Sequence, residues 1–329
     1  MATKVLAIDV GYGFVKWSRR KDNSIVKGII PSIVVPKTEN DLDGVNTNVS
    51  GLNEIKTSSG IMLCGSEIHR ITYQTALGKK LSQDYPKSDE YEALLKCAIL
   101  ESKSNDIDKL VLGLPVDMMA LKTNLISKFQ GLIEISGDKH RVSQVIVVPQ
   151  PIGSYMQFKH CKPDMFREIE THSASALFVD VGFGTTDWIT IAENQVLPRR
   201  SGGSHIAVGE MLKFLADRIR ATYSGDMIKD LEFLDKRLRG GLSLYYNQTS
   251  IPHETLVKIA GEFDFSPVLK KIDETIGTFS DVRYVILTGG GAKYLAPQFK
   301  QKHEVLDFVL LPDNNYSNVL GFLAIGEAL

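Results

Sequence analysis

The fold of this chain is decided by a stretch that occurs twice, first as Val5-Leu-Ala-Ile-Asp9-Val-Gly11-Tyr-Gly13-Phe-Val-Lys16-Trp17 and later as Ala176-Leu-Phe-Val-Asp180-Val-Gly182-Phe-Gly184-Thr-Thr-Asp187-Trp188. The offset is 171 residues at the aspartates (180 − 9) and at the tryptophans (188 − 17), and the chain has no other tryptophan. Each copy reads as a buried strand, a tight glycine turn and a returning strand. A repeat at about half the chain length predicts two related domains, each opening with this hairpin.

Composition agrees with two folded domains. The chain has 329 residues, which suits two domains of about 150 residues each. It is 43% hydrophobic and 23% charged, so bulk disorder is excluded. The net charge of −1 offers no overall field for holding nucleic acid or an anionic membrane, although a local patch stays open.

The sequence has no pattern typical of a membrane span, a signal peptide or a cysteine-based site. No apolar run approaches the roughly 18 residues of a membrane span. Only four apolar residues follow Lys4 before Asp9, which does not fit a signal peptide. The three cysteines are far apart and offer neither a disulfide framework nor a paired-cysteine zinc site. We expect a cytoplasmic protein that makes no membrane contact.

The repeated hairpin suits the binding of a phosphate chain. An aspartate at the end of a buried strand is costly unless a cation or donor meets it, and glycines let the backbone aim N–H groups at a ligand. Two such turns facing across a cleft would cradle phosphates, while Asp9 and Asp180 hold hydrated Mg²⁺. Lys16 adds a positive charge and Thr185 and Thr186 add hydroxyls. The remaining predicted cradle residues are Gly11, Tyr12, Gly13, Gly182, Phe183 and Gly184.

Other interpretations of the hairpin are weaker. A single Asp-Val-Gly-x-Gly could be an ordinary turn, but two copies matching over thirteen positions argue against that. No P-loop pattern occurs. The dinucleotide fingerprint needs glycine at its sixth position, which is Lys16 in one copy and Asp187 in the other.

A third glycine element lies near the C-terminus, where the apolar run from Tyr284 ends in Thr288 and three glycines, Gly289, Gly290 and Gly291. We expect a helix to begin near Ala292 and to stop at Pro297. A base and ribose could lie against the glycines, with Tyr294 beside them and the helix N-terminus favouring phosphates. Such a junction is often only structural, but with the two hairpins it supplies the third wall of a nucleotide cleft.

Two further segments predict hinge helices. One helix begins at Gln150 after a strand that ends at Pro149, and the other runs over residues 317–329 with Ser317 as its N-cap. Gly153 and Gly321 would let the two helices cross closely. Ordinary helix packing is the alternative.

In this order and spacing, five segments resemble the actin, Hsp-type chaperone and sugar-kinase ATPase superfamily. They are similar to its phosphate 1, connect 1, phosphate 2, adenosine and connect 2 motifs, found here at Asp9–Lys16, Gln150–Phe158, Asp180–Asp187, Thr288–Tyr294 and Ser317–Leu329. Within the superfamily the chain looks most like the plasmid-segregating actin-like proteins of the ParM/StbA type.

The resemblance implies an α/β fold of two duplicated, ribonuclease-H-like domains around a nucleotide cleft. Domain I would comprise residues 1–150 plus the C-terminal helix 317–329, and domain II residues 151–316. Smaller inserted parts would fall at residues 28–90, with little regular structure, and at residues 222–280.

The resemblance also implies roles at the site. Asp9 and Asp180 would be catalytic and would organise Mg²⁺, mainly through water, and Gln150 would orient the attacking water. A neutral glutamine cannot take a proton, so slow hydrolysis is expected. ATP is the expected nucleotide and GTP is possible. The stretch from Lys229 to Arg239 matches the family poorly, and we assign no base or ribose contact there.

The function implied is a filament-forming ATPase that segregates plasmid or other DNA by polymerising with ATP and disassembling on hydrolysis. Its partners would be copies of itself and a DNA-binding adaptor, with no direct nucleic-acid contact. Two alternatives stay open. A small-molecule kinase of the superfamily could use Asp187 as an extra acid, and a scaffold could bind nucleotide without turnover.

Overall fold

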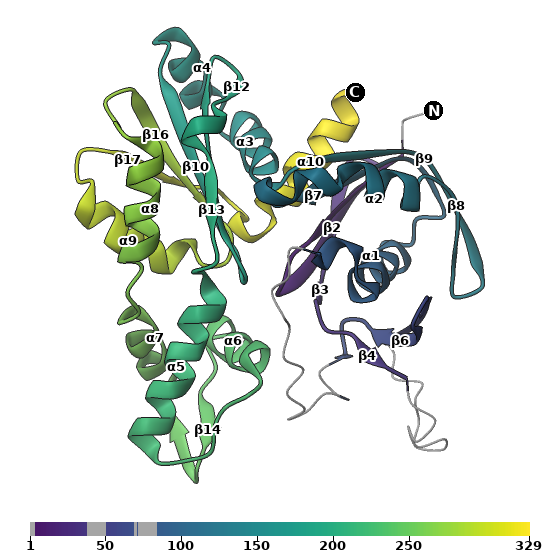
Figure 1. The fold of residues 1–329 in the computed structure, drawn as a ribbon, viewed down its shortest axis with the longest axis horizontal. Coiled ribbons are helices and arrows are strands. Elements are labelled where there is room, and N and C mark those ends of the chain that lie inside the picture. Colours follow the sequence, from purple (N-terminus) through teal and green to yellow (C-terminus); the bar gives the residue numbers. More distant parts are fainter. Residues whose placement is uncertain (1–3, 38–50, 69–70, 72–83) are drawn as a thin grey trace.

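The computed structural model of the chain describes residues 4–37, 51–68, 71 and 84–329, and has two lobes, each built on its own β-sheet (Figure 1). The rest of the N-terminal insert, residues 38–50, 69–70 and 72–83, lies outside the described residues. No helix among the described residues is long and apolar enough to cross a membrane.

The sheet of the first lobe joins an antiparallel hairpin to parallel strands. In spatial order its strands are β3 (Ser24–Pro31), β2 (Phe14–Lys21), β1 (Val5–Val10), β7 (Asp106–Leu114), β9 (Asp138–Pro149) and β8 (Gly131–Ile135). Helices α1 (Asp89–Glu101) and α2 (Lys122–Phe129) cover the face that includes Leu6 and Ile8. Because side chains alternate along a strand, Val5 and Ala7 face the other way and pack against α10 (Ser317–Ala328).

The sheet of the second lobe repeats the hairpin followed by two parallel strands, and among the described residues it has no counterpart of the edge strand β8. Its strands are β12 (Gln195–Val196), β11 (Thr186–Ala192), β10 (Ser175–Val181), β16 (Val282–Thr288) and β17 (Asp307–Leu310), with β13 (Gly202–Ser204) also paired to β11. One face packs on α5 (Val208–Tyr223), α8 (Ser266–Ile276) and α9 (Ala292–Lys302), and the other on α3 (Gln150–Cys161) and α4 (Pro163–Thr171). The predicted duplicated fold is confirmed.

The two hairpins share one register. Cross-strand partners fall at equivalent places: Asp9 with Lys16 and Ile8 with Trp17 in β1–β2, and Asp180 with Asp187 and Val179 with Trp188 in β10–β11. In each turn the first glycine donates its amide to the carbonyl three residues on. These bonds are 3.1 Å from Gly11 to Phe14 and 2.8 Å from Gly182 to Thr185. The strand–turn–strand prediction holds in both copies.

Each tryptophan packs on a glycine of the next strand. Trp17 lies opposite Gly28 of β3 and Trp188 opposite Gly202 of β13. A Cβ added at Gly28 would come 2.4 Å from the Trp17 ring, and one at Gly202 would come 2.9 Å from the Trp188 ring. The likeness of the two halves therefore extends to the strand beside each hairpin, β3 in the first lobe and β13 in the second.

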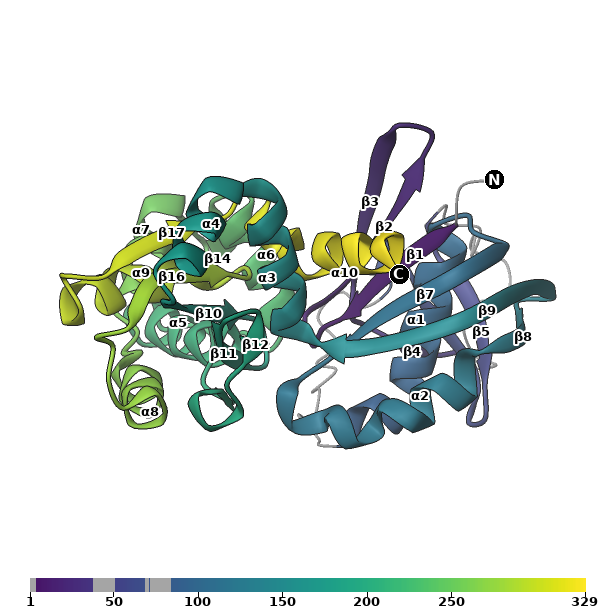
Figure 2. The same cartoon turned by 90° about the horizontal axis from the view of Figure 1, so that it is seen from above.

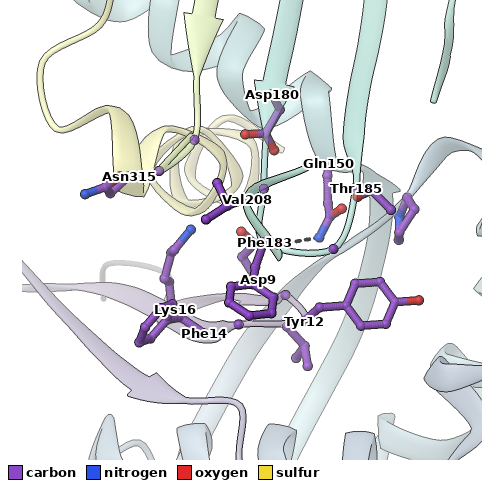
Figure 3. A pocket seen from close by; sticks show the side chains of 18 of the residues that line it. Asp9, Tyr12, Phe14, Lys16, Gln150, Asp180, Phe183, Thr185, Val208 and Asn315 are labelled. Atoms are coloured by element: carbon purple, nitrogen blue, oxygen red, sulfur yellow. Dashed lines mark hydrogen bonds between the residues drawn. The ribbon is translucent and has the colours of Figure 1, made fainter. Parts of the chain in front are cut away.

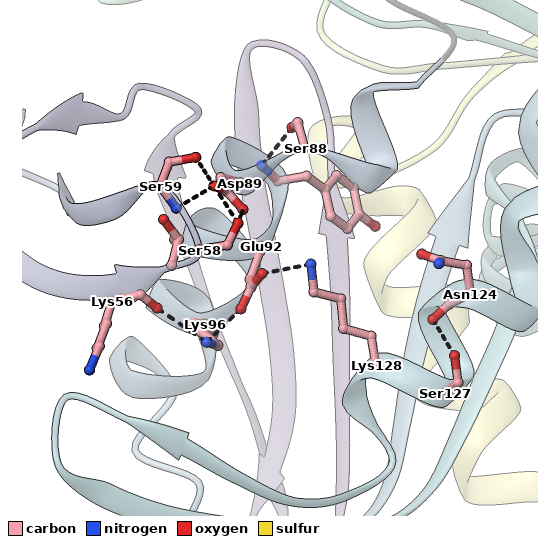
Figure 4. Close-up of polar contacts among 12 residues, drawn as sticks. Lys56, Ser58, Ser59, Ser88, Asp89, Glu92, Lys96, Asn124, Ser127 and Lys128 are labelled. Atoms are coloured by element: carbon pink, nitrogen blue, oxygen red, sulfur yellow. Dashed lines mark hydrogen bonds and ion pairs between the residues drawn. The ribbon is translucent and has the colours of Figure 1, made fainter.

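The first lobe carries a small sheet of β4 (Val35–Pro36), β6 (Gly60–Cys64) and β5 (Asn53–Thr57), so the prediction of little regular structure was wrong for this described part. Asp89, at the start of α1, accepts hydrogen bonds from the hydroxyls of Ser58 and Ser59 in the β5–β6 turn (Figure 4). Glu92 lies 2.6 Å from both Lys96 and Lys128, which joins α1 to α2. The Asp89 contacts fasten the small sheet to the lobe, and the Glu92 contacts join two helices of the lobe itself.

The second lobe carries its own insert, which extends away from the sheet (Figure 1). It contains α6 (Leu231–Arg239), β14 (Leu244–Tyr246), β15 (Thr249–Ile251) and α7 (His253–Gly261). Helix α8, inside the predicted insert 222–280, packs instead beside β13 and β11 of the main sheet.

Two predicted helix signals were wrong. Helix α9 continues through Pro297 to Lys302, because buried Leu295 and Phe299 anchor it on both sides of the proline. Ser317 does not cap α10, because the short helix η5 (Asn314–Tyr316) runs directly into it and makes Tyr316 the N-cap.

Helices α3 and α10 cross where the lobes meet (Figure 2). A Cβ added at Gly321 would lie 1.8 Å from the carbonyl oxygen of Gly153, and one at Gly153 would lie 2.3 Å from that of Asn318. The glycines are thus needed for the crossing. The helices are exchanged between lobes: α3 follows β9 of the first lobe but packs on the second, and α10 packs on β1 of the first.

Candidate functional site

A cleft lies between the lobes, and both hairpin turns line it (Figure 3). Most of the predicted site residues meet there. They are Asp9, Gly11, Tyr12, Gly13, Lys16, Gln150, Asp180, Gly182, Phe183, Gly184, Thr185, Gly289 and Gly290.

Three predicted binding residues do not line the cleft, and their positions give the reasons. Thr186 is fully buried on the core face of β11, where its hydroxyl donates to the carbonyl of Ile206. Gly291 packs under α5, since a Cβ there would meet Val208. Tyr294 packs against the core of the second lobe. We withdraw the predicted ligand contacts of these three residues.

The Asp9 carboxylate is held by a residue of α3, one of the two crossing helices. Asp9 ends a buried strand and is only 3% exposed. The side-chain amide nitrogen of Gln150, the first residue of α3, donates to Asp9 Oδ1 over 2.8 Å (Figure 3). This bond uses the amide nitrogen, so the amide oxygen of Gln150 is the atom that can accept a hydrogen bond from a water in the cleft.

The Asp180 carboxylate is held in the same manner by the other hinge helix. The side-chain amide of Asn318 in α10 donates to Asp180 Oδ2 over 2.7 Å. Burial raises the pKa of Asp180, and the negative charge of Asp9 adds to that effect. The positive charge of Lys16 and the Asn318 hydrogen bond oppose it. Lys16 therefore acts across the cleft on the carboxylate of the opposite lobe.

Asp187 lies beside this site but outside the cleft lining. It is 4% exposed, and burial raises its pKa to about 7 despite a hydrogen bond from Thr185. The negative charges of Asp180 and Asp117 raise the pKa further, and Lys271 lowers it. A buried carboxyl group thus stands where the first hairpin has Lys16.

The structure adds residues to the cleft that sequence reasoning missed. Asp235 and Arg239 of α6 form an ion pair of 2.7 Å there, and Asn315 lines the cleft near Gly290. The resemblance directed base and ribose contacts to the stretch from Lys229 to Arg239, but the match was too poor to assign a residue, although opposite charges four residues apart on a helix were a visible signal. No sequence pattern marked Asn315 as a residue of the cleft.

The lobes touch across the cleft at several points. A Cβ at Gly13 would lie 2.7 Å from Cβ of Phe183, so the two turns are in contact. The Arg239 guanidinium lies 4.3 Å from the centre of the Phe14 ring. Each contact joins a residue of the first hairpin to one of the second lobe.

The acidic residues of the cleft fit Mg²⁺. The described residues contain no group of three or more His, Cys, Asp or Glu side chains that would form an all-protein metal site. Mg²⁺ usually keeps several waters and takes one or two carboxylates together with substrate phosphates. Asp9 and Asp180, facing one cleft beside two glycine turns, supply that donor set.

The fold and cleft define a class: a two-lobed protein in which each lobe contributes one glycine turn of the repeated hairpin to a shared cleft. Two family models match, "Actin like proteins N terminal domain" over residues 7–153 and "Archaeal actin homologue MreB-like, C-terminal" over residues 178–301. Between them they span both lobes, and the chain belongs to the actin-like superfamily. No curated protein matches it significantly in sequence.

Solved structures show the same fold at low sequence identity. The archaeal actin homologue Ta0583 superposes with a TM-score of 0.74 at 19% identity, covering 99% of this chain and 100% of that chain. Its complex with ADP gives 0.71 at 18% identity, with the same coverage. ParM from Clostridium botulinum, solved as a 15-stranded filament, gives 0.73 at 18% identity and covers both chains completely.

Proposed function

We propose that this protein is a nucleotide-switched, filament-forming ATPase. The observation that carries the proposal is the pair of matching hairpins that face one cleft, each with a carboxylate held by a hinge-helix amide. The ADP complex of Ta0583, which has this fold, supports nucleotide binding. ATP is the proposed nucleotide, with GTP as the alternative, because the base-specific contacts lie outside the hairpins.

In this proposal the glycine turns bind the phosphates and Lys16 offsets their charge. Asp9 and Asp180 would hold Mg²⁺ through its waters, and the ion would neutralise charge on the phosphates. The amide oxygen of Gln150 would orient the attacking water. Glutamine cannot take the proton, which must pass to a phosphate oxygen or to solvent, so turnover is slow and suits a timer.

Assembly follows from closure of the cleft. Loss of the terminal phosphate would loosen the contact between hairpins that belong to different lobes. A head-to-tail contact that does not close on itself generates a filament. A difference of about 1–3 kcal/mol per contact between nucleotide states is enough to switch growth to disassembly. The filament of Clostridium botulinum ParM supports self-assembly for this fold.

We further propose a cytoplasmic role in moving plasmid or other DNA through an adaptor protein, without direct nucleic-acid contact. The small-molecule kinase is the weaker alternative. Its extra acid would be Asp187, which is buried and does not line the cleft.

The test is Gln150→Ala, compared with Gln157→Ala on the same helix. Gln157 bonds Cys161 and does not line the cleft. We expect Gln150→Ala to slow phosphate release about 10- to 100-fold, to leave ATP binding intact and to lengthen filament lifetime. Gln157→Ala should behave like the wild type. Pelleting, light scattering and phosphate release, with and without a metabolite panel, measure these effects.

Wild-type protein that stays monomeric at high concentration with magnesium and non-hydrolysable ATP would overturn the filament. Phosphate transfer to a metabolite in place of water would establish the kinase.

A further inference from the structure

Both the nitrogen and the oxygen of the Asn318 side-chain amide form hydrogen bonds. Its nitrogen faces the Asp180 carboxylate at 2.7 Å, and its oxygen accepts a hydrogen bond of 2.6 Å from the Ser154 hydroxyl. The Ser154 oxygen lies 2.9 Å from that of Thr288. A carboxylate only accepts hydrogen bonds, so the nitrogen of the Asn318 amide must face Asp180 and its oxygen must face Ser154.

Burial makes this chain of contacts rigid. Ser154 and Thr288 are fully buried and Asn318 is 7% exposed. The three residues come from α3, β16 and α10, so the two hinge helices and the second sheet meet at one point. Asn318 does not line the cleft itself and touches it only through Asp180.

The geometry makes Asn318 the partner of Gln150 in the second half of the repeat. Both amides lie in the first turn of a hinge helix, 168 residues apart (318 − 150), close to the offset of 171 between the aspartates. Gln150, on the helix packed against the second lobe, holds the aspartate of the first. Asn318, on the helix packed against the first lobe, holds the aspartate of the second.

We propose that Asn318 is a positioning residue that orients the Asp180 carboxylate toward the cleft. Because Asn318 lies on α10, which packs on the first lobe, the orientation of Asp180 would change when the lobes rotate about the crossing helices. The inference rests on the proposed function, because it needs a bound magnesium nucleotide. Gln150 keeps its amide oxygen for water, whereas the oxygen of Asn318 is occupied by Ser154. Asn318 therefore has no direct part in hydrolysis and acts through Asp180.

The test compares Asn318→Leu, which keeps the size of the side chain but removes its donor, with Ser317→Ala in the same turn of α10. The Ser317 hydroxyl is buried and has no hydrogen-bond partner among the described residues, so its loss should be neutral. Binding of a fluorescent ADP analogue is titrated with Mg²⁺ and repeated in chelator. Calorimetry checks that each variant is folded.

For Asn318→Leu we expect the half-saturating Mg²⁺ concentration to rise about 10-fold, the usual lower effect of losing a residue that orients a metal ligand. Metal-free nucleotide binding should change less than about twofold. Ser154→Ala keeps the donor but frees the Asn318 amide to turn, and should give a smaller rise. It also keeps the test decisive if Asn318→Leu does not fold.

An unchanged Mg²⁺ dependence in both variants, or an equal loss of binding with and without Mg²⁺, would overturn the positioning role and leave the proposed ATPase standing. Wild-type protein without any Mg²⁺-dependent nucleotide binding would instead overturn the proposed function, and the inference with it. The measurement on the wild type therefore distinguishes failure of the Asn318 proposal from failure of the proposed function.

Discussion

The hairpins β1–β2 and β10–β11 have the same backbone register but carry different charged residues. Asp9 pairs across its hairpin with Lys16, whereas Asp180 pairs with Asp187. The first hairpin thus brings a cation into the cleft, and the second places a buried carboxyl group with a raised pKa next to its aspartate. The two halves share the glycine turn and differ in the residue opposite each aspartate.

The amides that hold the two aspartates also differ between the halves. The amide oxygen of Gln150 has no hydrogen-bond partner in the part of the chain that the structure describes, whereas that of Asn318 accepts from Ser154. In the proposed mechanism the first half acts on the water, and the second half only fixes geometry. Substitutions at matched positions of the two halves test this division.

The largest expected effect is at the aspartates. Replacing Asp180 by alanine should lower nucleotide hydrolysis by about 100-fold or more while the fold persists, because the proposed mechanism needs its charge to organise the phosphates and the metal. Asp9→Ala should be as severe, since both halves contribute one carboxylate. Phosphate release measures the loss, with calorimetry as the check on folding. Wild-type turnover in Asp180→Ala would refute its assignment.

The duplicated fold could be predicted because one pattern occurs twice with an unchanged spacing from Asp9 to Trp17 and from Asp180 to Trp188. Such a pattern needs only local physics, namely apolar strands and a glycine turn. The hairpin in each lobe follows from it, and the structure agrees.

The site was predicted less completely, for physical reasons. Thr186 follows Thr185 along the chain, and strand alternation turns its side chain to the core, a consequence that the sequence contained and we missed. Asn318 could not be found in this way. Its offset from Gln150 departs by three residues from the repeat, and its partner Asp180 is 138 residues away in the chain. Tertiary structure alone brings them together.

A second, intermediate effect is expected from Asp187→Asn in the nucleotide-free protein. The folded protein holds the Asp187 proton up to about pH 7, whereas the unfolded chain releases it near pH 3.8. Between these values the folded state binds more protons, so the wild type loses stability as the pH rises. Asparagine removes this loss and should make the variant more stable above pH 7, by up to about 4 kcal/mol.

The measurement is urea unfolding of both proteins between pH 4 and pH 8. The two stability curves should converge near pH 4 and separate as the pH rises. Curves that stay parallel across this range would show that Asp187 is ionised throughout, and that the second hairpin carries two charged carboxylates.

The smallest effect concerns the packing that the halves share. In both, a tryptophan ring covers a glycine, and a methyl group at Gly28 would overlap Trp17 more deeply, at 2.4 Å, than one at Gly202 would overlap Trp188, at 2.9 Å. Both rings are buried and cannot move freely. We expect Gly28→Ala and Gly202→Ala each to destabilise the protein by about 1–3 kcal/mol, with Gly28→Ala the larger.

The location of the damage sharpens this last comparison. Gly28 belongs to the first sheet and Gly202 to the second, so each variant should lower the calorimetric transition of its own lobe if the lobes unfold separately. Gly261→Ala at the end of α7 is the control, because a methyl group there meets open space and alanine favours a helix. If Gly28→Ala were as harmless as this control, the packing of Trp17 would be loose, and the structural likeness of the halves would stop at the hairpin.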